Sequence, residues 1–272
     1  YIGFQTRRAA LNFAAAAREF SGAKGPAGAL RLDGRHVRAE AVPISIETER
    51  YSAVAGRPES QRVAAELRTD LGDPEIIILG VDRLDYTKGI DLRLRAIETL
   101  FDDHPELHGR VSFVQVAVPS REDVDEYQEI RRRVEELVGR INGRFGRAGW
   151  LPVHYMFRSL PFEELIGAYV AADVMLVTPL RDGMNLVAKE YVATRLDDSG
   201  VLILSEFAGA AERLDDALLV NPYHLDALAE TIARAVDMDA TEQQDRMRRL
   251  RRVVQRWDVH DWARHNLEAI AG

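Results

Sequence analysis

Runs of apolar residues, each followed by a polar loop, divide the chain from residue 75 onward. The runs read EIIILGV (75–81), VSFVQVAV (111–118), VHYMF (153–157), ADVMLV (172–177) and GVLILSE (200–206). Because successive residues of each run are apolar, the runs are typical of strands buried on both faces of a parallel sheet. The segments between and after them predict helices over residues 122–142, 162–171, 186–194 and 225–237. This alternation predicts a doubly wound, Rossmann-like α/β sheet over roughly residues 73–237.

The first 72 residues follow a different pattern. The chain opens on YIGFQT without a methionine, and Thr6 is a suitable N-cap for a helix whose apolar residues begin at Leu11. A Gly-rich loop follows, and then we expect a short strand around Val37, a buried strand over 42–46 and a helix over 60–71. An opening within an apolar segment indicates that a longer protein continues upstream.

Composition and charge narrow the class of protein. The net charge of −8 argues against the broad basic face that nucleic-acid binding requires. No apolar run reaches the roughly 18 residues of a membrane-spanning helix, and the absence of cysteine excludes disulfide and thiolate chemistry. The seven histidines show no metal-ligand spacing, and no glycine-rich nucleotide fingerprint is present. We expect a soluble cytoplasmic protein without metal, cofactor, nucleic-acid or membrane partner, and homo-oligomer formation stays open.

Basic residues follow several of the predicted strands. In a doubly wound sheet, ligands bind beyond the carboxyl ends of the strands. The loops at those ends read DRLDYTKG (82–89), PSRED (119–123), RSLPFEEL (158–165), TPLRDGMN (178–185) and FAGAAE (207–212). Arg83, Lys88 and Arg121 therefore gather along one edge, where helices begin and their free N–H groups favour an anion such as phosphate. In an acidic protein, such local cations have to hold any anionic ligand.

Each candidate residue also has a purely structural interpretation. Arg83 and Lys88 can pair with the aspartates of their own loop, and Arg121 can be ordinary surface charge beside two acidic residues. Asp182 can be the N-cap of the helix that follows it. Glu190 lies inside that helix, where a glutamate is usually a carboxylate exposed to solvent.

Longer motifs carry a resemblance to a known family. The segments VDRLDYTKGI, QVAVPSREDVDEYQ, TPLRDGMNLVAKEY, SEFAGAAERL and VHDWARHNLEAI occur in this order. Together they closely resemble the trehalose-6-phosphate synthase family, and the resemblance runs from IGFQT to the end of the chain. The family consists of retaining glucosyltransferases with two Rossmann-like domains that face a cleft, the GT-B arrangement. The resemblance implies transfer of glucose from a nucleotide-glucose (UDP-, ADP- or GDP-glucose) to glucose 6-phosphate, which gives α,α-trehalose 6-phosphate.

The resemblance also implies a role for each candidate residue. Arg83 and Lys88 match the basic pair that holds the donor diphosphate and stabilises it as it departs. Asp182 matches the carboxylate that contacts glucose hydroxyls, Glu190 matches the one that binds the ribose, and Arg121 matches an arginine that reaches the acceptor phosphate. Positions that match backbone contacts to the sugar and phosphate are Gly183, Met184, Asn185 and Leu186, and those for the nucleobase are Ser159 and Leu160.

A domain organisation follows from the same resemblance. Residues 1–72 would be a remnant of the amino-terminal, acceptor-side domain, 73–250 the donor-binding domain, and 251–272 a helix that crosses back. Trp257 and Trp262 in that last helix are expected to pack in a core. Because the rest of the acceptor-side domain is expected upstream, we expect the chain alone to bind the donor weakly and to be inactive.

Two alternatives stay open at this point. A related GT-B transferase with another phosphorylated acceptor would keep the same donor half. A non-catalytic module that senses sugar phosphates would also resemble the family, although the intact set of Arg83, Lys88, Asp182 and Glu190 favours an active site.

Overall fold

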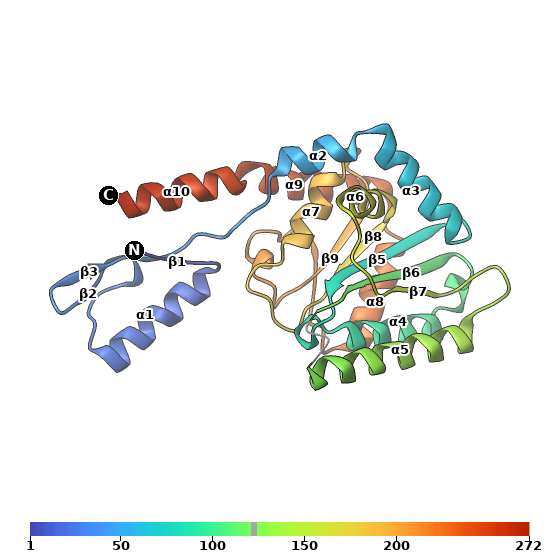
Figure 1. The fold of residues 1–272 in the computed structure, drawn as a ribbon, viewed down its shortest axis with the longest axis horizontal. Coiled ribbons are helices and arrows are strands. Elements are labelled where there is room, and N and C mark those ends of the chain that lie inside the picture. Colours follow the sequence, from blue (N-terminus) through green and yellow to red (C-terminus); the bar gives the residue numbers. More distant parts are fainter. Residues whose placement is uncertain (121–123, 272) are drawn as a thin grey trace.

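A six-stranded parallel sheet forms the centre of the molecule (Figure 1). The computed structural model describes residues 1–120 and 124–271. The strand order is β10-β9-β8-β5-β6-β7, which confirms the predicted doubly wound sheet. The strands are β5 Ile76–Arg83, β6 Val111–Val118, β7 Val153–Met156, β8 Val174–Val177, β9 Val201–Ser205 and β10 Leu218–Val220. The edge strand β10 was not predicted, because three residues are too few to show a pattern.

The order of the strands reverses between β5 and β8. β5 pairs with β6 along its whole length, but it pairs with β8 only at Ile78–Val174 and Leu79–Met175. Toward their carboxyl ends, β5 and β8 are therefore no longer joined by ladder hydrogen bonds. Such a reversal point is where open α/β sheets bind their ligands.

Helices cover both faces of the sheet, and each face has its own apolar core. One layer consists of α2 Thr48–Ala55, α3 Pro58–Asp70, α6 Phe162–Ala171, α7 Leu186–Thr194 and α9 Ala240–Arg256. The other consists of α4 Ile90–Asp103, α5 Asp125–Phe145 and α8 Leu225–Val236, visible below the sheet in Figure 1. No helix among the described residues is long and apolar enough to span a membrane.

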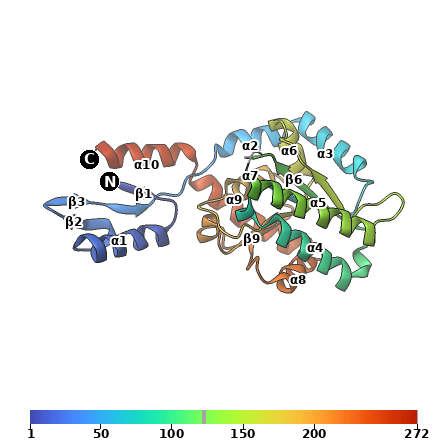
Figure 2. The same ribbon diagram turned by 60° about the horizontal axis from the view of Figure 1, so that its bottom comes forward.

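A smaller group of elements stands beside the sheet, and it contains both ends of the chain (Figure 2). It consists of β1 Ile2–Phe4, α1 Arg7–Ser21, β2 Leu30–Leu32, β3 Arg35–Val37, β4 Ala39–Ala41 and α10 Val259–Ala271. Thr6 is the N-cap of α1 as expected, since its hydroxyl accepts a hydrogen bond from Ala9 N–H at 3.1 Å. The group has a small apolar core of its own around Ala14 and Leu30.

The predicted strand over residues 42–46 is wrong, because this segment crosses between the two parts without a neighbouring strand. Val42 N–H donates to Phe4 O and Ile46 O accepts from Val259 N–H, and side chains satisfy other backbone groups of the segment. Ile44 N–H donates to Gln5 Oε1 at 2.8 Å, and Ile44 O accepts from Lys189 Nζ at 2.7 Å. Extended, buried backbone without a ladder needs such partners, so the crossing segment (residues 42–47) is fixed by long-range contacts.

The two tryptophans near the carboxyl end also bind this crossing segment. Trp257 Nε1 donates to Pro43 O at 2.7 Å, and Trp262 Nε1 donates to Val42 O at 3.1 Å. Both indoles are half-buried, so they act as hydrogen-bonding contacts and not as the buried core residues that we expected. The single helix predicted around them is broken at Trp257, where α9 ends and α10 begins two residues later.

Helices α2 and α3 lie before the predicted domain boundary at residue 72, yet they pack on the sheet body. Val54 and Ala64 belong to the same apolar core as the strands, and α3 contacts α6 closely. Gly167 of α6 permits this contact, since a Cβ atom there would lie 2.4 Å from Val63 Cγ1. The exact boundaries of the domains stay a prediction.

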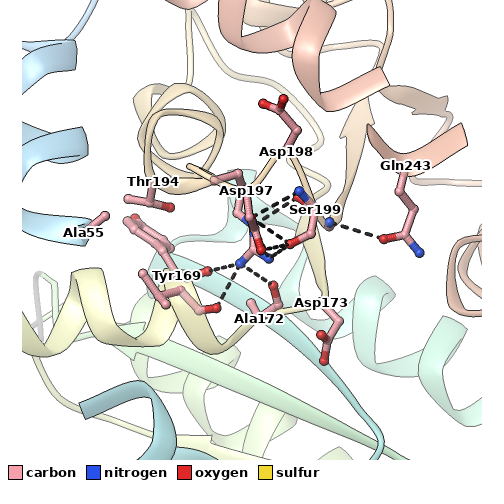
Figure 3. Close-up of polar contacts among 12 residues, drawn as sticks. Ala55, Tyr169, Ala172, Asp173, Thr194, Asp197, Asp198, Ser199 and Gln243 are labelled. Atoms are coloured by element: carbon pink, nitrogen blue, oxygen red, sulfur yellow. Dashed lines mark hydrogen bonds and ion pairs between the residues drawn. The ribbon is translucent and has the colours of Figure 1, made fainter. Parts of the chain in front are cut away.

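Arg195, which is 7% exposed, joins the ends of α6 and α7. Its guanidinium donates to the carbonyls of Tyr169, Val170 and Ala172, which end α6, at 3.1, 2.9 and 3.1 Å. It also bonds Ser199 in the loop before β9, and Figure 3 shows this loop beside Tyr169 and Ala172. A cation at the carbonyl end of α6 stabilises the helix that supplies Tyr169 to the candidate site.

Arg93 of α4 is completely buried beneath the point where β5 and β8 separate. It donates to Asp82 Oδ2 at 2.5 Å, to Gln115 Oε1 at 2.8 Å and to Thr178 Oγ1 at 2.9 Å. Gly80 leaves the space for it, since a Cβ atom there would lie 2.5 Å from Arg93 Nη1. Burial raises the pKa of Asp82 above its ordinary value, although the charge of Arg93 acts in the opposite direction.

Replacing Arg93 with Met is expected to destabilise the chain by about 3–5 kcal/mol, because Asp82 would be left buried without its cation. The pKa of Asp82 is raised in the folded state, so its ionisation lowers stability as pH rises through that folded-state pKa. The loss should therefore be smaller at acid pH than at neutral pH. Urea unfolding at the two pH values measures it, with the exposed Arg95→Met on the same helix as the matched control. An equal loss at both pH values would contradict the assigned role of Asp82.

Candidate functional site

The loops that follow β5 and β8 lie against each other at the carboxyl edge of the sheet. Leu180 N–H donates to Thr87 O at 2.8 Å, and this hydrogen bond joins the two loops. Gly89 has a φ of 62°, and a Cβ atom there would lie 2.8 Å from Leu180 Cδ2. A glycine is therefore required at this position for both the backbone conformation and the close approach.

The central contact of the site is an ion pair between Lys88 and Asp182. Lys88 Nζ lies 2.6 Å from Asp182 Oδ2, and the two side chains are 14% and 16% exposed. Asp182 Oδ2 also accepts from Asn185 Nδ2 at 3.1 Å, and Oδ1 accepts from Met184 N–H at 3.3 Å. The pair thus joins the β5 loop to the turn that begins α7.

Asn185, and not Asp182, is the N-cap of α7. Its side-chain oxygen accepts from Ala188 N–H at 3.2 Å, and its φ of 71° places it outside the helix. The structural interpretation of Asp182 as a cap is therefore wrong, because its carboxylate is already engaged by Lys88 and by its own turn. The remaining N–H groups at the start of α7 lie next to the Lys88–Asp182 pair.

The interpretation in which Arg83 and Lys88 pair with the aspartates of their own loop is also not what the structure shows. Asp82 pairs with Arg93, and Lys88 pairs with Asp182. Asp85 accepts hydrogen bonds from Thr87 N–H and Oγ1 and from Tyr127. Burial alone would raise the pKa of Asp85, but the hydrogen bonds and the nearby charge of Arg83 lower it below its usual value. Arg83 itself is exposed at the edge.

The loop after β9 holds the turn from the other side. Gly209 N–H donates to Asp182 O at 3.1 Å, and Ala210 N–H donates to Met184 O at 2.8 Å. A Cβ atom on Gly209 would lie 2.1 Å from Gly183 O and 2.9 Å from Thr6 Cγ2. Because nothing larger than glycine fits between these atoms, Gly209 sets the position of the turn relative to the start of α1.

Glu190 is partly buried and accepts hydrogen bonds from tyrosines, so the structural interpretation of Glu190 as a solvated carboxylate is wrong. Tyr169 Oη donates to Glu190 Oε2 at 2.8 Å, and Tyr169 is fully buried. Burial first, and then the charge and hydrogen bond of Glu190, raise the pKa of both Tyr169 and Tyr51. The two phenols keep their protons and orient the carboxylate. Neither tyrosine could be assigned to the site from the sequence, because Tyr169 comes from α6 and Tyr51 from α2.

The remaining predicted residues have different placements. Ser159 is exposed and Leu160 is half-buried, and both lie between β7 and α6, where Leu160 packs against the core. No hydrogen bond among the described residues links them to the Lys88–Asp182 pair. Arg121 lies outside the described residues. Within the described part of the chain, no group of three or more His, Asp or Glu side chains could hold a metal ion.

Comparison with known proteins identifies the family of this chain. The model of glycosyltransferase family 20 matches residues 1–272. Trehalose-6-phosphate synthase of Mycobacterium avium is 47% identical over 279 residues, which cover 99% of this chain and 57% of that protein. The counterpart in Mycobacterium sp. strain KMS is 48% identical, again over 99% of this chain and 57% of the relative. The chain therefore spans less than two thirds of these relatives.

Solved structures agree with this result. The UDP-forming α,α-trehalose-phosphate synthase of Burkholderia xenovorans, in complex with glucose-6-phosphate, has a TM-score of 0.94 and 39% identity. The match covers 99% of this chain and 60% of that one. An E. coli structure with bound UDP-2-fluoro glucose has a TM-score of 0.93 and 38% identity, over 98% and 59% of the two chains. The predicted resemblance is confirmed, and this chain belongs to glycosyltransferase family 20.

Proposed function

We propose that this chain forms the donor-binding half of a retaining glucosyltransferase that converts a nucleotide-glucose and glucose 6-phosphate into α,α-trehalose 6-phosphate. The observation that carries the proposal is the Lys88–Asp182 pair at the start of α7, at the reversal point of the sheet. Relatives named trehalose-6-phosphate synthase, and structures with glucose-6-phosphate and UDP-2-fluoro glucose, support the choice of substrates. UDP-glucose is the donor that they favour.

We infer a place for each part of the donor from the candidate site together with the family resemblance. A diphosphate beside Lys88 would meet its ammonium, the guanidinium of the exposed Arg83 and backbone N–H groups at the start of α7, where Met184 N–H already donates to Asp182. Asp182 would accept hydrogen bonds from glucose hydroxyls. Glu190, already oriented by two tyrosines, would accept those of the ribose. We assign the nucleobase to the backbone of Ser159 and Leu160 and the acceptor phosphate to Arg121.

The main catalytic requirement of this reaction is to stabilise the diphosphate leaving group. The bond between the glucose anomeric carbon and the donor phosphate oxygen breaks, and a bond to the anomeric hydroxyl oxygen of glucose 6-phosphate forms on the same face. The proton of that hydroxyl passes to the departing phosphate oxygen. Lys88 and Arg83 stabilise the negative charge that grows on the diphosphate, an electrostatic role that needs no covalent carboxylate intermediate.

Titration of the chain with UDP, ADP and GDP tests the donor site directly. We expect at least UDP to bind, and product analysis with the full-length enzyme then tests the reaction. Folded protein that binds none of the three nucleotides would overturn the assignment of the donor site.

Lys88→Ala is expected to weaken UDP binding about ten- to a hundredfold, the loss that follows from removing one charge-assisted hydrogen bond of about 1.5–3 kcal/mol. Isothermal titration of the variant against the parent chain measures this. Lys24→Ala is the matched control, because Lys24 is exposed and lies in the smaller group of elements. Equal UDP affinities in the parent chain and the Lys88 variant would contradict the role of Lys88.

Glu190→Gln is expected to remove the preference for ribose over deoxyribose. The parent chain should bind UDP about tenfold more tightly than 2′-deoxy-UDP, since a carboxylate that loses its hydroxyl partner forfeits a charge-assisted bond. The variant should bind the two nucleotides almost equally. The exposed Glu163→Gln on α6 is the control and should keep the preference. A preference that survives in the Glu190 variant would place the ribose elsewhere.

A further inference from the structure

A second group of cations surrounds a cavity between the two parts of the molecule. The cavity has a volume of about 240 Å³, and its polar lining consists of Gln5, Arg7, Lys189, Glu212 and Arg213. Gln5 and Arg7 come from the smaller group of elements, whereas the other three come from α7 and the loop after β9. This volume corresponds to roughly eight water molecules at about 30 Å³ each, so the cavity has room for a small polar ligand.

The charges around this cavity do not balance. Of the described residues, three cationic side chains line it and only one carboxylate, that of Glu212, whose Oε2 already accepts a hydrogen bond from Arg7 N–H at 3.0 Å. Among the described residues, none of the three cations has an ion pair with a carboxylate. The lining therefore carries an excess of about two positive charges, which a dianion would neutralise.

Lys189 is the most constrained of these cations. It is only 5% exposed, and its ammonium donates one hydrogen bond, to Ile44 O at 2.7 Å. An ammonium has three N–H donors, so two are available to a ligand in the cavity. Burial, and then the like charge of Arg213, lower the pKa of Lys189 to about 8. An isolated buried cation is costly, and an anion beside Lys189 and Arg213 would relieve that cost.

The other two cations, Arg213 and the exposed Arg7, come from different parts of the molecule. The guanidinium carbon of Arg213 lies 5.5 Å from the centroid of the Trp257 ring, a cation–π distance that restrains the side chain. Arg7 is the first residue of α1, whose start is fixed by Thr6 and by the contact with Glu212. Gly209, packed between Gly183 and Thr6, allows the two walls of the cavity to approach each other closely.

We propose that this cavity binds a phosphate-type dianion, either inorganic phosphate or a small phosphate monoester, at a site separate from the diphosphate pocket around Lys88. Lys189 contacts the ligand from the buried side, and Arg7 and Arg213 contact it from the two walls. Because these residues belong to both parts of the molecule, the bound dianion strengthens the contact between them. Lys189 directly precedes Glu190 in α7, so the ligand also stabilises the helix that carries the proposed ribose contact.

Binding of inorganic phosphate and of glycerol 3-phosphate to the chain, measured by isothermal titration at constant ionic strength, tests this proposal. We expect Arg213→Gln and Arg7→Gln each to weaken binding at least about tenfold, the effect of losing one charge-assisted hydrogen bond. The exposed Arg95→Gln on α4 is the control and should bind like the parent chain. The ligand that binds more tightly identifies which of the two sources the site prefers.

The Lys88→Ala variant separates this site from the proposed donor pocket. Phosphate binding that persists in Lys88→Ala and falls in Arg213→Gln supports the second site, whatever the outcome of the UDP titrations. Phosphate binding that is lost in Lys88→Ala but unchanged in Arg213→Gln and Arg7→Gln would place the anion in the donor pocket and overturn the proposal. Absence of phosphate binding to the folded parent chain would also overturn it. Circular dichroism confirms the fold of each variant, and Arg7→Gln tests the opposite wall if Arg213→Gln does not fold.

Discussion

The ion pair between Lys88 and Asp182 connects two loops at a height where their strands are no longer hydrogen-bonded to each other. Beneath it, Arg93 links Asp82 at the end of β5 to Thr178 after β8. Two charged contacts thus replace the missing part of the β-ladder. The ammonium of Lys88 is thereby held at the reversal point of the sheet, where it pairs with the carboxylate of Asp182. A ligand with two negative charges can compete with Asp182 for the ammonium of Lys88. The Asp182 carboxylate would then keep hydrogen-bond partners, because it still accepts from Asn185 Nδ2 and Met184 N–H.

Much of the sheet could be predicted because its strands are apolar on both faces, and all five predicted strands are present. Topology predicted the edge of the sheet at which the candidate site lies, since the carboxyl ends of parallel strands share one edge. Local detail could not be predicted in the same way. Both Asp182 and Asn185 are good cap residues, and Asn185 is the cap because Lys88, 94 residues away, engages Asp182. Glu190 looked solvated because nothing near it in the sequence indicates Tyr169.

The crossing segment shows how tertiary contacts can override an apolar pattern. Residues 42–46 alternate and contain β-branched side chains, which favours a strand. Hydrogen bonds from Lys189, Trp257 and Trp262 satisfy its carbonyls instead, so extended backbone is stable there without a sheet. Every one of these donors follows the segment by more than 140 residues. The local sequence shows that the segment is apolar, but it does not show the distant side chains that donate hydrogen bonds to its carbonyls. The strand prediction failed for that reason.

The acidic net charge constrains how this chain can bind anions at all. With a charge of −8, the averaged field of the molecule repels a phosphate at long range. At physiological ionic strength that field decays over about 8 Å, so only cations within the site determine its local potential. Lys88 pairs with Asp182 in the turn before α7, whereas Lys189 lies on that helix and lines the cavity beside the crossing segment. One nine-residue helix therefore has a cationic group at its start and another along its side. Because Glu190 lies next to Lys189 in that helix, any shift of α7 that improves one anion contact also moves the carboxylate that we propose binds the ribose.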